Sequence, residues 1–210
     1  SFSTITNLFD FGFSTTLLRH VTYIWCGAET LNREGICTST NTSRNDKAFI
    51  TILRICKYIY LIVGLLAFIF CGIFGTCYIR YVIRDIYHPK YMIAWAIYAS
   101  STCFNLYFGY WSVLLKGIGA IKQTQKATVY GYLIQLILSY LGLLLGLGIV
   151  SLAISSLISS MSIRIISRFY FIRYQDISSA LSKNYVLTKE ELFKAFRAIW
   201  FNAKKAGIST

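Results

Sequence analysis

The residue of this sequence with the clearest capacity for chemistry is Arg19, which interrupts the apolar stretch FDFGFSTTLLRHVTYIWCGA at residues 9–28. A charged side chain at the middle of a membrane span costs about 2.5 kcal/mol or several times more, so it is expected to face protein or a wet cavity. We therefore predict that Arg19 points inward. The alternatives are that the segment lies at the outer interface with Arg19 reaching water, or that Arg19 only binds backbone carbonyls.

Helical spacing predicts which side chains accompany Arg19. A helix that begins at Gly12 places a weakly polar stripe on one face: Thr15 or Thr16, Arg19, Thr22 or Tyr23, and Cys26. Similar stripes of small and polar residues in later segments are typical of helix packing, although the amides of Asn105 and Gln135 are harder to satisfy by packing alone.

The composition indicates a membrane protein. Hydrophobic residues make up 56% of the 210 residues, and the mean hydropathy is +0.56. The chain carries 21 Lys and Arg against 8 Asp and Glu. In so apolar a chain, this excess favours anionic membrane lipids as partners over nucleic acid.

Windows without charged residues indicate where helices cross the bilayer. Residues 58–79 and 91–115 are uncharged and long enough to span a core of about 30 Å. Residues 127–163 would be about 55 Å long as one helix, so we predict a turn at the glycines of Leu141–Gly148. The predicted fold is an all-α, polytopic integral membrane bundle of five helices, near 7–27, 55–79, 91–115, 127–145 and 149–170.

The basic residues support this topology. Five helices place 17 Lys and Arg in residues 31–57, 116–126 and 164–205 on one side, against 3 on the other. Short cytoplasmic loops are rich in Lys and Arg, so the basic side is predicted to be cytoplasmic. Because the sequence begins and ends close to apolar segments, we expect a piece of a longer protein.

Two parts of the chain are distinguished. Residues 1–187 are predicted to form a partial N-terminal transmembrane lobe. In residues 188–210, Thr188 and Glu191 form a capping-box pattern before a basic amphipathic helix with Leu192, Phe196 and Ile199 on one face. That helix is expected either to lie on the inner leaflet or to pack as an ordinary cytoplasmic helix on the bundle.

Motifs for catalysis and cofactors are not found in the sequence. The six cysteines form no CxxC pair, the histidines are His20 and His88, and no GxxxxGK[ST] occurs. We therefore predict a protein that is not an enzyme, without catalytic residues, cofactor or metal.

The opening stretch resembles the second helix of the polysaccharide transporters, which are O-antigen flippases of the multidrug/oligosaccharidyl-lipid/polysaccharide exporter superfamily. The matching positions are Asp10, Gly12, Ser14, Thr16, Arg19, Tyr23, Gly27 and Ala28. LLKGIGAIKQTQ, residues 114–125, resembles the family's basic loop after its fourth helix, and AIWFNAKKAGIS resembles the lead into its seventh.

This resemblance implies helices two to six of the N-terminal lobe of a larger two-lobe transporter in the bacterial cytoplasmic (inner) membrane. The implied function is translocation of a lipid-linked, undecaprenyl-pyrophosphate type oligosaccharide for O-antigen and lipopolysaccharide biosynthesis. Polysaccharide polymerase and chain-length proteins would be partners. A planar guanidinium can hold two phosphate oxygens, so we expect Arg19 to bind the pyrophosphate or acidic sugars, with Thr15, Tyr23 and Asn105 bonding to sugar.

Two other functions are considered. Cation-coupled multidrug efflux by the same superfamily requires a buried carboxylate, and Asp10, toward the outer end of the first segment, is the acid that could couple an ion. The second alternative is a membrane subunit that does not transport but scaffolds glycan-synthesis enzymes through its basic loops.

Overall fold

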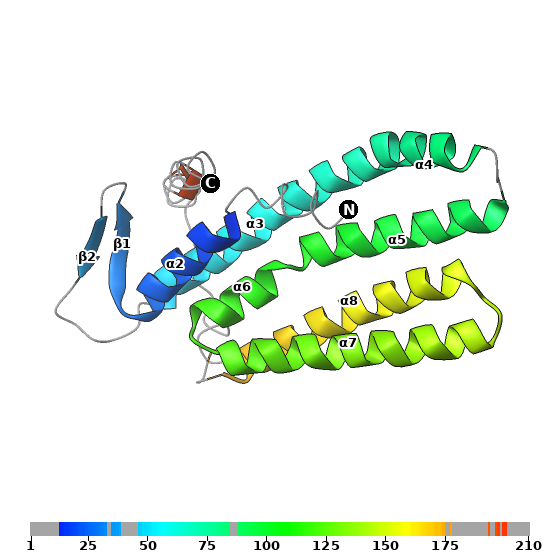
Figure 1. Ribbon diagram of the computed structural model, residues 1–210. Helices are drawn as coiled ribbons and strands as arrows, with labels where there is room; N and C mark the ends of the chain where they lie inside the picture. The colour runs from blue at the N-terminus through cyan, green and yellow to red at the C-terminus, as the bar shows by residue number, and fades with distance from the viewer. Residues whose placement is uncertain are drawn as a thin grey trace.

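The computed structural model describes residues 13–32, 35–38, 46–84, 88–174, 177, 193, 196–197 and 199–200. The described part is a bundle of long helices with one small hairpin (Figure 1). The all-α prediction is confirmed for the bundle. In chain order the elements are α2 (Phe13–Trp25), β1 (Ala28–Asn32), β2 (Gly35–Thr38), α3 (Asp46–Phe70), the π-helical turn η1 (Cys71–Gly75), α4 (Thr76–Val82), α5 (Pro89–Tyr107), α6 (Tyr110–Gly117), α7 (Ile121–Leu144) and α8 (Ile149–Ile172).

In the part of the chain that the structure describes, three helical stretches are long and apolar enough to cross a membrane: Asp46–Val82, Ile121–Leu144 and Ile149–Ile172. The chain is therefore a membrane protein with transmembrane helices. The helix predicted near 91–115 is divided, because α5 ends at Tyr107 and α6 begins at Tyr110. The helix predicted near 7–27 is described only as α2, whose 13 residues extend about 20 Å, less than a bilayer core of about 30 Å.

The long helices pack side by side in the order α3, α5, α8 and α7 (Figure 1). The shorter α2 packs on α6 and on α3. We call the end that holds α2, α6 and the start of α7 the basic end, and the end that holds the α7–α8 turn the turn end. Lys47, Lys116, Lys122 and Lys126 are exposed at the basic end.

The turn predicted between residues 141 and 148 is confirmed. α7 ends at Leu144 and α8 begins at Ile149. Gly146 and Gly148 have φ of +73° and +56°, a region that other residues adopt with difficulty. Leu145 is 77% exposed there. The apolar surface therefore continues to the turn itself.

Serine and glycine hold α7 against α8, as the packing interpretation of the polar stripes predicts. The hydroxyls of Ser139 and Ser155 are 2.6 Å apart, and Ser159 donates to the carbonyl of Gly131 over 2.8 Å. A Cβ added to Gly131 would overlap Ile163. The two backbones therefore approach closely because small residues line the contact.

The helix that contains α3 is longer than predicted. It runs 37 residues from Asp46 to Val82, or about 55 Å, so it exceeds the hydrocarbon core by about 25 Å. Arg54 and Lys57 lie on its exposed side. The predicted start of this helix, near residue 55, falls at these charges, but a helix continues past charged residues when their side chains face water.

The π-helical turn η1 is packed against α5. The indole N–H of Trp95 donates to the Thr76 hydroxyl over 3.2 Å, and that hydroxyl donates to the carbonyl of Cys71 over 3.5 Å. A Cβ on Gly75 would lie 2.5 Å from the Trp95 ring. The wider turn thus brings the backbone of η1 directly under an aromatic side chain.

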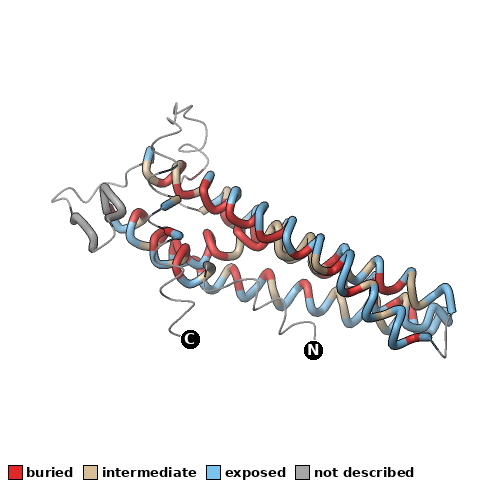
Figure 2. The backbone as a smooth tube through the Cα atoms, turned by 90° about the horizontal axis from the view of Figure 1, so that it is seen from above, coloured by how far each residue is buried: buried red, intermediate tan, exposed pale blue. Residues whose placement is uncertain are grey.

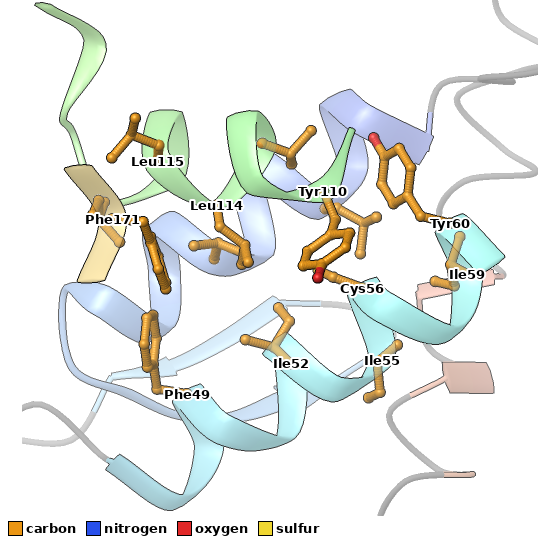
Figure 3. Close-up of a cluster of buried hydrophobic side chains, with 14 of the residues drawn as sticks. Phe49, Ile52, Ile55, Cys56, Ile59, Tyr60, Tyr110, Leu114, Leu115 and Phe171 are labelled. Carbon is orange, nitrogen blue, oxygen red and sulfur yellow. The ribbon is translucent and has the colours of Figure 1, made fainter. Parts of the chain in front are cut away.

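The main hydrophobic cluster lies at the basic end, where α2, α3, α6 and the end of α8 meet (Figure 3). Phe49 of α3 stacks on Phe171 of α8 with ring centroids 6.2 Å apart, and Leu114 of α6 is fully buried beside them. Figure 2 shows buried residues concentrated in this part of the backbone, whereas the long helices alternate buried and exposed positions. This end therefore resembles the core of a water-soluble domain.

A short β-hairpin follows α2, in a region that is predicted to be a loop. β1 and β2 pair antiparallel, with Leu31 opposite Ile36 and Asn32 opposite Gly35. The register shifts between Ala28 and Thr30. Because the hairpin is short and stands apart from the long helices, the class of the fold does not change (Figure 1).

Candidate functional site

The most distinctive polar group in the described part of the bundle surrounds Arg164 of α8. Its Nε donates to the amide oxygen of Asn105 on α5 over 3.0 Å, and its Nη2 donates to the same oxygen. Its Nη1 donates to the Ser112 hydroxyl on α6 over 2.5 Å. The break between α5 and α6 lies between these two partners. All three side chains are partly buried.

These partners are neutral, so they orient the guanidinium without neutralising its charge. Each terminal nitrogen of a guanidinium carries two N–H groups. Among the described residues, Ser112 accepts from one N–H of Nη1, and Asn105 accepts from one N–H of Nη2. One N–H group therefore remains on each of these two nitrogens and can bind a further acceptor.

A hydrocarbon core of about 30 Å that begins at Ile149 contains Arg164. It is 15 residues beyond Ile149 in α8, or about 22 Å along the helix axis, compared with a core of about 30 Å. The turn before Ile149 is itself apolar and exposed. The charge is therefore about one and a half turns inside the basic-end boundary, where a cation is expensive unless it is paired or hydrated.

A second arginine of α8 lies one turn closer to the basic end. Arg168 is exposed, and its guanidinium carbon is 5.7 Å from the centroid of the Trp111 ring on α6. At about 28 Å from Ile149 it reaches the membrane boundary. Arg164 and Arg168 therefore form a short cationic series from the boundary into the bundle.

The predicted orientation of Arg19 is wrong in this structure. Thr15, Arg19 and Tyr23 do share one face of α2, but that face is exposed, as is Cys26 directly after the helix. Leu17 and Val21 are instead fully buried. The apolar face determines the orientation, because it covers α3 and α6 at the main hydrophobic cluster.

The position of α2 explains why an outward Arg19 is tolerated. Thr22 donates to the carbonyl of Gly117 over 2.9 Å, and a Cβ on Gly117 would lie 2.5 Å from Val21. Gly117 precedes α7, whose first residue is about 35 Å from Leu144 along the helix. This part of α2 is therefore beyond a core of about 30 Å, and Arg19 does not lie at mid-membrane.

The predicted sugar-binding group is divided by the fold. Thr15, Arg19 and Tyr23 lie on the exposed face of α2, whereas Asn105 lies on α5 and binds Arg164. Asp10, the predicted ion-coupling acid, lies outside the described residues. Within the described ranges, no group of three or more His, Cys, Asp or Glu could hold a metal ion.

Arg164 was not among the predicted site residues, because it falls in the basic segment 164–205 that is predicted to be cytoplasmic. The signal that could have identified it is helical spacing. Ser160, Arg164 and Ser167 recur every three to four residues within the helix predicted near 149–170. Ser160 bonds to Ser101 of α5 over 3.3 Å, and Ser167 is fully buried, which confirms that this face points into the bundle.

Comparisons with known proteins add no relative. The chain matches no protein-family model, no curated protein and no solved structure.

Proposed function

We propose that this protein is a transporter that translocates a lipid-linked oligosaccharide, joined to its lipid by pyrophosphate, across the bacterial cytoplasmic membrane for surface polysaccharide synthesis. The observation that supports it most is the position of Arg164. A partly buried cation within a membrane-spanning helix, with hydrogen bonds to neutral side chains, favours an anionic ligand that offsets its charge.

The distribution of acids supports an anionic rather than a cationic substrate. No Asp or Glu occurs between Asp85 and Asp176, so α5, α6, α7 and α8 contain no carboxylate. The same stretch contains Lys90, Lys116, Lys122, Lys126, Arg164, Arg168 and Arg173. An organic cation would be repelled along these helices, so this feature disfavours cationic-drug efflux.

The chemistry required of the site is binding, since translocation breaks no covalent bond. A pyrophosphate that leaves water loses hydration, and charge-assisted hydrogen bonds from a guanidinium replace part of it. Asn105 and Ser112 hold the guanidinium in one orientation. The remaining N–H on each terminal nitrogen can then bind two oxygens of one phosphate group.

Arg19 has a different place in this proposal. It is exposed at the basic end, beyond the hydrocarbon core, on the face that also carries Thr15 and Tyr23. There it would contact the anionic group or acidic sugars at the membrane surface. Arg164 would contact the anion within the bundle, so the two arginines act at different stages.

The test compares Arg164→Gln and Arg164→Lys in the whole protein, with Arg80→Gln as the matched control because Arg80 is exposed near the turn end. Surface glycan display is measured at equal membrane abundance. We expect the Gln variant to lose at least about tenfold in display, the Lys variant to keep part of it, and the control to be unaffected. Normal display by an abundant Gln variant would contradict the proposal.

Reconstituted vesicles separate the alternative functions. Purified protein that moves a fluorescent lipid-pyrophosphate glycan across the bilayer supports the transporter. Glycan display that depends on the protein, without translocation in vesicles, would favour the scaffold. Loss of resistance to cationic drugs in the Arg164→Gln strain, with glycan translocation intact, would favour efflux.

A further inference from the structure

The connection between α6 and α7 gathers three exposed lysines at the basic end. Lys116 is in the last turn of α6, and Lys122 and Lys126 are one turn apart on α7; all three are exposed. The connection is tight, because the N–H of Ala120 donates to the carbonyl of Leu115 over 3.0 Å and Gly119 has φ of +83°. The lysines are therefore attached to an ordered backbone.

The exposed face of α7 changes from basic to apolar one turn after Lys126. The face that carries Lys122 and Lys126 continues at helical spacing with Tyr130, Leu133, Ile137, Tyr140 and Leu144, which are all exposed. Lys126 is 18 residues before Leu144, or about 27 Å along the axis, so it lies near the boundary of a core of about 30 Å. One face of α7 therefore carries positive charge at the level of the lipid headgroups and apolar side chains at the level of the acyl chains.

The charges at this boundary have no acidic neighbour in sequence. Residues 86–175 contain no Asp or Glu, and the opposite face of α7 is occupied by its contact with α8. Several neighbouring lysines attract anionic headgroups. Salt screens this attraction beyond about 10 Å at moderate ionic strength. The complementary partner is therefore a phosphate at the membrane surface with an apolar tail.

We propose that Lys116, Lys122, Lys126 and the apolar face of α7 bind an anionic phospholipid of the leaflet at the basic end. The phosphate contacts the lysines, and the acyl chains lie along Tyr130, Leu133 and Ile137. This site is separate from Arg164, which lies on α8 and faces α5 and α6. The inference therefore does not depend on the proposed transport function.

The experiment measures lipid binding to the whole protein, purified in a neutral detergent, by native mass spectrometry with phosphatidylglycerol or phosphatidylcholine. We expect retention of phosphatidylglycerol in preference to phosphatidylcholine. Lys122→Gln/Lys126→Gln should weaken phosphatidylglycerol binding by on the order of thirtyfold. Arg80→Gln/Arg84→Gln, which removes two exposed charges near the turn end, is the control and should retain the preference.

Each other outcome overturns the inference. A double Lys variant that keeps the preference shows that the lysines do not bind the headgroup, and equal loss in the control shows a general charge effect. Binding of a polyprenyl diphosphate but not of phosphatidylglycerol would assign the lysines to the transported substrate instead. Because glycan display is not measured, failure of the transporter proposal leaves this result unchanged.

Discussion

The basic end and the membrane-spanning part of this protein are packed by different means. At the basic end, Phe49, Leu114 and Phe171 are fully buried in one cluster of large side chains. Along α7 and α8, large residues such as Leu136 and Ile165 are more than 60% exposed, and the contact is made by serine and glycine. In water, the exposed apolar side chains of α7 and α8 would be unfavourable. In a bilayer, the same side chains contact lipid tails that are equally apolar.

This difference indicates where the stability of the fold originates. Burial of apolar area stabilises the basic end, because water is the competing solvent there. Between membrane helices, lipid tails are as apolar as leucine, so close backbone contact and hydrogen bonds contribute instead. Substitutions in the two regions should therefore follow different rules.

The largest expected effect is at the basic end. Phe49→Ala removes a fully buried ring that stacks on Phe171, so we expect a loss of about 3–5 kcal/mol in the free energy of unfolding. Leu136→Ala on α7, where the side chain is 66% exposed, should change it by less than about 0.5 kcal/mol. Denaturant unfolding of the protein in lipid nanodiscs checks both, and equal losses would remove the contrast.

An intermediate effect is expected at the α7–α8 contact. Gly131→Leu would place a side chain where Ile163 lies, and overpacking of this kind costs about 1–3 kcal/mol. Gly72→Ala is the control, since a Cβ there meets no atom within 4 Å. Thermal unfolding should show a lower midpoint for the first variant alone. A similar fall for Gly72→Ala would mean that replacing a helix glycine lowers the midpoint even without a steric overlap, and would contradict the close-packing explanation.

The smallest expected effect concerns the hydroxyl pair between Ser139 and Ser155. Hydrogen bonds between membrane helices contribute about 0.6 kcal/mol on average, because the separated helices also find partners. A double-mutant cycle of Ser139→Ala and Ser155→Ala should therefore give a coupling free energy of about that size. A coupling free energy well above about 2 kcal/mol would show that this hydrogen bond contributes more to the stability of the α7–α8 contact than close packing does.

Much of the helical layout could be predicted because it follows from apolar length. The uncharged stretch 127–163 is too long for one span, and its glycines give the turn that separates α7 from α8. The start of α3 could not be placed in the same way. Its charged residues Arg54 and Lys57 lie on an exposed face, and the number of charges does not reveal which face of a helix they occupy.

The candidate site was harder to predict because it depends on contacts between distant residues. Asn105 and Arg164 are 59 positions apart and meet only when α5 packs on α8. Arg19 stood out in the sequence because it is flanked by apolar residues. Those neighbours turned out to bury the opposite face of α2, so the same pattern placed Arg19 outside.

The π-helical turn η1 has a consequence for how this helix can change during evolution. A π-turn takes up one residue more than an α-helical turn within about the same rotation, so the residues beyond it keep their side of the helix. Deletion of one residue from Cys71–Gly75 would therefore let a continuous α-helix form and would leave α4, with Arg80, on its present side. The turn η1 is thus a place where the helix can lose one residue while both of its ends stay in register.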